Sequence, residues 1–194
     1  MENKQDLRVI KTKRNIKNAF IEILLEKDFK EITVQNILDK ALINRKTFYN
    51  HYMDKYDLAD QMIQDFFDEC TAFLDMRSQN FKNIDGFLDQ VDSIYKEVFQ
   101  QRDLILALWT IQTDNIDFYG SMESLFQSKY RQLFQNDKEK SGDIDFQAHL
   151  FSTFILGSLK YMLDSNKNYT AREVWNEVSS FCQTITSVSI HPDR

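Results

Sequence analysis

Residues 44–55 bring together side chains that can bind a polyanion. Two cations in a row, several hydroxyl and amide groups, a histidine and a further lysine fall within these twelve positions. Guanidinium and ammonium groups pair with phosphates, while amide and hydroxyl groups can also hydrogen-bond base edges in the DNA major groove. With one threonine upstream, the candidate DNA-binding residues are Thr33, Asn44, Arg45, Lys46, Thr47, Tyr49, Asn50, His51 and Lys55.

Two short helices joined by a tight turn would position these groups. Thr33 stands where an N-cap belongs, because its hydroxyl can accept hydrogen bonds from free amides of the first turn. The helix that follows has one apolar stripe: Val34, Ile37, Leu38 and Ala41. Asn44 is the N-cap candidate of the second helix, in which only Phe48 and Tyr52 are spaced to anchor a core. The second helix therefore exposes mainly donors and cations, as a recognition helix does.

At these residues the chain resembles the TetR (tetracycline-repressor) family of bacterial regulators. The DNA-binding segment of that family typically contains Thr-Val, then Ala-Gly-Val-Ser, then Thr-Leu-Tyr-x-His-Phe and a following Lys. The matching residues here are 33–34, 41–44, 47–52 and Lys55, and the likeness covers about residues 8–60. Leu42 replaces the family's usual turn glycine. A left-handed leucine costs about 1–2 kcal/mol, so the turn either bears this strain or adopts another conformation.

Composition predicts an all-α protein of two parts. The chain has 194 residues but only four Gly and one Pro, and its apolar residues follow helical spacing. Residues 1–56, the expected helix-turn-helix domain, contain 12 Lys and Arg against 8 Asp and Glu. Residues 57–194, the expected dimerisation and ligand-binding domain, contain 12 against 22. The basic head and acidic body favour a head that binds DNA, although a net +4 alone could be an ordinary solvated surface.

No signal peptide or uninterrupted membrane span is visible, and two distant cysteines fit a reducing cytoplasm. We therefore expect a cytoplasmic protein. We expect neither a metal nor a cofactor, and no catalysis, since GxxxxGK[ST], GxGxxG and HExxH motifs are all absent from the sequence. The many carboxylates of residues 57–194 are interpreted as a solvated acidic surface.

The C-terminal part offers candidates for an effector site and for dimerisation. Aromatic residues could line a ligand cavity or simply fill the core; the candidates are Trp109, Tyr119, Phe126 and Tyr161. Residues 146–163 lack a charged face, so we expect them to pack on a partner subunit together with residues 172–188. We place Ile155 on that wide apolar face; the alternative is that it faces its own core. The family resemblance likewise implies a homodimer formed by the last two helices.

These observations predict a sequence-specific transcriptional regulator that binds a palindromic operator. Arg45, Lys46 and Asn50 are assigned to base edges, and Tyr49, His51 and Lys55 to phosphates. Together with the resemblance they favour a repressor released by a small-molecule or protein effector. The alternative is a TetR-like co-regulator whose main partner is another protein.

Overall fold

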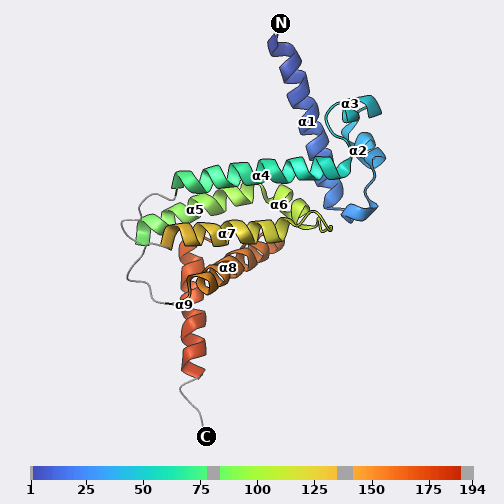
Figure 1. Ribbon diagram of the computed structural model, residues 1–194. Helices are drawn as coiled ribbons and strands as arrows, with labels where there is room; N and C mark the ends of the chain where they lie inside the picture. The colour runs from blue at the N-terminus through green and yellow to red at the C-terminus, as the bar shows by residue number, and fades with distance from the viewer. Residues whose placement is uncertain (1, 78–83, 135–141, 189–194) are drawn as a thin grey trace.

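The computed structural model describes residues 2–77, 84–134 and 142–188, and these form nine α-helices with one short 3-10 turn (Figure 1). Their order is α1 (Glu2–Leu24), η1 (Phe29–Glu31), α2 (Val34–Ala41), α3 (Arg45–Tyr49), α4 (Lys55–Arg77), α5 (Ile84–Gln100), α6 (Arg102–Trp109), α7 (Phe118–Phe134), α8 (Ile144–Ser165) and α9 (Ala171–Val188). Between α6 and α7 an isolated bridge pairs Gln112 with Asp117. The predicted all-α fold is confirmed.

Helices α1, α2 and α3 form a head at one end of the long helix α4. Their apolar stripes converge on fully buried side chains, among them Phe20 of α1, Ile37 of α2 and Phe48 of α3. Leu58 and Met62, in the first turns of α4, close this core from below. Burying each of these side chains stabilises the fold by about 1.5–3 kcal/mol, so the short α2 and α3 are held by packing rather than by their own propensity.

Helices α4 to α8 form the body, and α9 leaves it at the end opposite the head (Figure 1). Helices α7 and α8 pack against each other most extensively, whereas α9 packs mainly against α5. One buried cluster runs from Ile16 of α1 through Leu108 of α6 to Leu163 of α8. A second, smaller cluster centred on Leu88, Tyr95 and Leu159 joins α5 to α8. The main cluster therefore crosses the predicted domain boundary at residue 56.

Helix α1 begins well before the part of it that packs on the core. The helix begins at Glu2, and the first buried side chain among those described is that of Ile16. In Figure 1 this first half of α1 extends beyond the core, on the side of α4 where α3 lies. Periodicity could not locate this start because residues without a core to pack against show no apolar stripe.

Candidate nucleic-acid interface

Thr33 begins α2 through a capping box, as predicted for an N-cap. Its hydroxyl oxygen accepts from the Asn36 backbone N–H at 3.2 Å, and its own backbone N–H donates to Asn36 Oδ1 at 3.0 Å. The hydroxyl also donates to Asn36 Oδ1 at 2.9 Å. Two otherwise free amides of the helix start are thereby satisfied. Thr33 thus fixes the position of α2 within the head.

The turn between α2 and α3 keeps the left-handed conformation despite its leucine. Leu42 has φ 54° and ψ 44°, and its side chain is 90% exposed. The backbone N–H groups of Leu42 and Ile43 both donate to the carbonyl of Leu38. Of the two alternatives left open by the sequence, the strained left-handed turn is the one adopted. The angle between α2 and α3 is consequently that of a turn normally built with glycine.

Asn44 caps α3 and points the start of that helix outward. Its Oδ1 accepts from the Thr47 backbone N–H at 2.8 Å and from the Thr47 hydroxyl at 3.0 Å. Phe48 is fully buried and Tyr52 is 2% exposed, which confirms both as anchors. Arg45 and Lys46 are exposed in the first turn. The pair can therefore reach a ligand without any rearrangement of the core.

The remaining candidates of this segment lie in and just after α3. Tyr49 is the last residue of the helix and is 47% exposed, with the Arg45 guanidinium 5.8 Å from its ring centroid. Asn50 is exposed and His51 is half-buried, but both follow the helix in the turn that leads to Tyr52. The recognition helix is thus shorter than the sequence suggested. Its charged groups are concentrated at its beginning.

Lys55 is placed differently from its predicted role as an exposed phosphate contact. Its ammonium donates to the carbonyls of Phe29 at 2.7 Å, Ile32 at 2.7 Å and Lys30 at 3.2 Å. It also lies 4.7 Å from the centroid of the Phe29 ring, and burial lowers the pKa of Lys55. Because all three donors are used, a phosphate contact would require these bonds to break. Lys55 joins the start of α4 to the loop that precedes α2.

Several other cations of the head have carboxylate partners. Lys17 is paired with Asp65 of α4 at 2.5 Å. Lys40 lies 2.9 Å from Glu22, and its hydrogen bond and charge interaction with that carboxylate raise the pKa of Lys40. These pairs link α1 to α4 and to α2. They leave Arg45 and Lys46 as the exposed cations at the start of α3.

The body contains a cavity of about 490 Å³ between α4, α5, α6, α7 and α8. Its lining is predominantly apolar, and it includes two of the four predicted ligand residues, Trp109 and Phe126. Tyr119 stacks against Trp109 at 5.9 Å and is 38% exposed, while Tyr161 is 56% exposed; both lie outside the cavity lining. A polar atom on an aromatic ring therefore did not by itself separate the cavity residue Trp109 from the exposed Tyr119 and Tyr161.

Sequence reasoning missed other lining residues, including Tyr95 of α5 and Lys129 of α7. Each lies on the apolar face of an amphipathic helix. Its spacing alone could not show that the apolar faces of several helices enclose one cavity. Cys70 also lines the cavity, and burial raises the pKa of its thiol to about 11. Such a thiol remains protonated at neutral pH and is a poor nucleophile.

The last two helices expose a series of large apolar side chains. On α8 these are Phe146, Leu150, Phe154 and Tyr161; on α9 they are Trp175, Phe181 and Ile185. The prediction that Ile155 belongs to this exposed face is wrong. Ile155 packs on the smaller buried cluster and lines the cavity. Residues one position apart on a helix differ by about 100° in direction, so Phe154 faces outward while Ile155 faces the core.

Comparison with known proteins agrees with this description, although no family model matches the chain. An uncharacterised HTH-type transcriptional regulator of Bacillus subtilis (strain 168), YxbF, is 27% identical over 188 residues, which is 93% of this chain and 47% of that protein. The chain thus spans about half the length of this curated relative. A TetR transcriptional regulator from Streptococcus agalactiae 2603V is 26% identical with a TM-score of 0.61, covering 91% of this chain and 96% of the other.

NalD, described as the secondary repressor of the MexAB-OprM multidrug efflux pump in Pseudomonas aeruginosa, shares the fold. Its TM-score is 0.63 at 17% identity, over 84% of this chain and 90% of NalD. Together, the capped α2–α3 pair and the helical body have the architecture of helix-turn-helix regulators. Within that class, the chain is similar in sequence and fold to a TetR regulator of known structure. The relatives are regulators rather than enzymes, in agreement with the prediction of no catalytic activity.

No helix within the described ranges is long and apolar enough to cross a membrane.

Proposed function

We propose that this chain is a sequence-specific DNA-binding regulator that acts as a homodimer, with residues 1–56 as the DNA-binding part. The observation that supports this most directly is the start of α3. There, Asn44 caps the helix and leaves Arg45 and Lys46 exposed, while Phe48 fixes the helix to the core. A helix held in this way can enter a major groove with its first residues toward the bases.

Within this proposal Arg45, Lys46 and Asn50 contact base edges, and Tyr49 and His51 contact phosphates. Selection of bound duplexes from a random pool tests the proposal and yields the operator. Arg45→Ala should then cost about 1–3 kcal/mol on the selected site and much less on random DNA. Lys96→Ala, which removes an exposed cation from α5 in the body, is the control and should bind normally. Equal losses on both duplexes would make Arg45 a phosphate contact instead.

We infer that α8 and α9 form the dimer interface. A single short α3 reads too few base pairs to select one genomic site, whereas two copies related by a two-fold axis read a palindrome. The exposed side chains of α8 surround Gly157, and a Cβ added at Gly157 would meet nothing within 4 Å. A small residue in the middle of an apolar face allows a partner helix to approach closely.

Gly157 offers a test that does not depend on damage to the monomer. Gly157→Gln places a long side chain in open space and improves helix propensity, so each monomer should stay folded. We expect it to sediment as a monomer at tens of micromolar and to lose operator affinity, whereas Gly157→Ala should remain dimeric. A Gly157→Gln protein that still forms the wild-type dimer would place the interface elsewhere.

We further propose that the protein is a repressor released by a small, mainly apolar effector bound in the cavity. The cavity is lined by Phe66, Cys70 and Phe73 of α4, and the same helix begins in the head at Lys55. A molecule that moves this part of α4 would therefore shift the head. In a thermal-shift screen, an effector should raise the Tm of the wild type and release the operator. Ile94→Trp, which fills part of the cavity, should abolish both effects, whereas the exposed Lys96→Trp should not.

A further inference from the structure

The first half of α1 is strongly cationic and projects from the protein. Residues 7–17 contain five cations, Arg8, Lys11, Lys13, Arg14 and Lys17, and no carboxylate. We call residues 2–15 the N-terminal arm, because the first buried residue of α1 is Ile16. At 1.5 Å per residue the arm is about 20 Å long. Such a run is unusual in a chain whose net charge is −6.

The cations of the arm are not explained by the fold. Arg8, Lys11 and Arg14 follow one another at three-residue intervals and are all exposed. Given 100° per residue, Lys11 and Arg14 lie on the side of α1 opposite the buried Ile16, Phe20 and Ile23, and Arg8 lies about 90° from that buried face. Within the described residues these three cations therefore serve neither core packing nor the link to α4 that Lys17 makes through Asp65.

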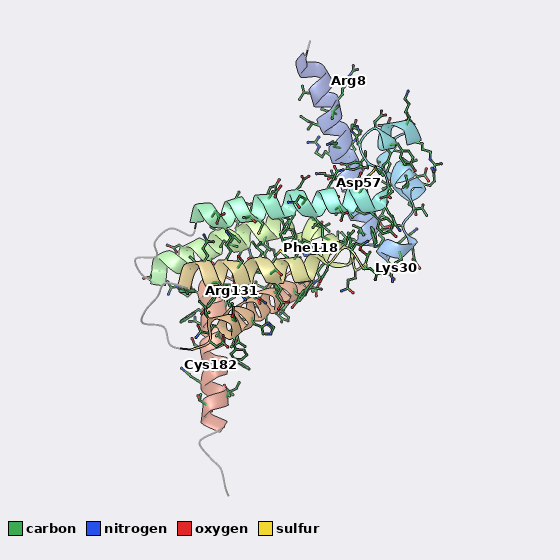
Figure 2. The ribbon with its side chains drawn as sticks, in the orientation of Figure 1. Arg8, Lys30, Asp57, Phe118, Arg131 and Cys182 are labelled. Carbon is green, nitrogen blue, oxygen red and sulfur yellow. The ribbon has the colours of Figure 1, made fainter. Side chains whose placement is uncertain are left out.

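The arm lies on the same side of α4 as α3 (Figure 1), and Figure 2 shows Arg8 on the projecting part of α1. The exposed apolar residues Leu7 and Ile10 are interspersed with the cations rather than forming a separate stripe, which argues against a coiled-coil partner. A ligand that matches the arm is therefore a polyanion that continues past α3. Its length corresponds to about six base pairs at roughly 3.4 Å each.

We propose that the N-terminal arm binds the DNA backbone flanking the base pairs that α3 contacts, through Arg8, Lys11 and Arg14. This inference rests on the proposed DNA-binding function and adds a second contact surface to it. The arm adds affinity but no sequence specificity, because its charged side chains contact phosphates and not base edges. DNA length beyond the recognised sequence should therefore contribute to binding.

The test uses the full chain and two duplexes that contain the site selected from a random pool. One duplex ends at the edges of the selected sequence, and the other extends eight base pairs beyond each edge. The variant is Arg8→Gln/Lys11→Gln, since glutamine preserves helix propensity. The matched control is Lys96→Gln/Lys167→Gln, which removes two exposed cations from the body. Affinity is measured by fluorescence anisotropy across a salt series, with hydroxyl-radical footprinting of the long duplex.

For the wild type, we expect tighter binding to the long duplex and protection of the flanking backbone. The arm variant should lose this gain, by about eightfold for each phosphate contact at 0.1 M salt, and its salt slope should fall by about two per protomer. On the short duplex the arm variant should match the wild type, as the control should on both duplexes. Equal dependence on duplex length in wild type and arm variant would overturn the inference. Failure of the wild type to select any sequence would overturn the proposed function itself.

Discussion

Replacement of Leu42 by glycine should stabilise the protein. Leu42 is held in the left-handed region at φ 54° and ψ 44°. For a residue with a Cβ this conformation costs about 1–2 kcal/mol, which glycine does not pay. Glycine also gains freedom in the unfolded chain, which costs about 0.4–1 kcal/mol. The side chain is 90% exposed, so its removal gives up little burial. The expected net gain is about 0.5–1 kcal/mol in the free energy of unfolding.

Urea denaturation at a fixed protein concentration measures this gain, because dimer formation would make stability depend on concentration. Leu42→Ala is the matched control. It removes the same exposed surface but keeps the Cβ, and should stay within a few tenths of a kcal/mol of the wild type. If the glycine and alanine variants shift the midpoint equally, the leucine side chain rather than the backbone is responsible. If Leu42→Gly is destabilising, the left-handed turn is not strained.

Lys55→Met keeps an unbranched side chain, one atom shorter, but removes the three bonds to carbonyls. It should lower the free energy of unfolding by about 1–3 kcal/mol in urea. The slope of operator affinity against salt should stay unchanged, since a fall of about one would indicate a phosphate contact instead. Tyr52→Phe should stabilise by about 1 kcal/mol, because the buried Tyr52 hydroxyl has no hydrogen-bond partner among the described residues. Burial raises the pKa of Tyr52 to about 12 from 10.0. Between these two pH values Tyr52 ionises in the unfolded chain but not in the folded one, so the free energy of unfolding of the wild type is unaffected below pH 10 and falls toward pH 12. The advantage of Tyr52→Phe in urea midpoints should therefore be larger at pH 10.5 than at pH 8; an equal advantage at both would show that Tyr52 titrates normally.

The parts of the site that depend on local sequence were predictable. Thr33 and Asn44 act as caps because their short polar side chains reach amides only three residues away. Phe48 and Tyr52 are buried because they are the two large apolar groups on one face of their segment. Capping bonds and the burial of one helix face depend on residues within one or two turns. They can therefore be predicted from the sequence without knowledge of the rest of the fold.

Relations between distant segments were not predictable in the same way. Lys55 finds its carbonyl partners more than twenty residues away, and nothing in its own surroundings indicates them. Ile155 and Phe154 are adjacent apolar residues on a helix that is apolar on many sides, so periodicity could not decide which one faces inward. Trp109 and Tyr119 both looked like cavity residues, but only the packing of five helices separates them.

The main buried cluster has a consequence for how the chain folds. It joins Ile16 and Phe48 of the head to Leu108, Phe118 and Leu156 of the body. Head and body therefore belong to one cooperative folding unit, and heating should melt them in a single transition. A fragment ending at residue 56 would lack the side chains that cover its own core. Exchange of heads between relatives would therefore succeed only if the matching residues of α4 and α6 were transferred as well.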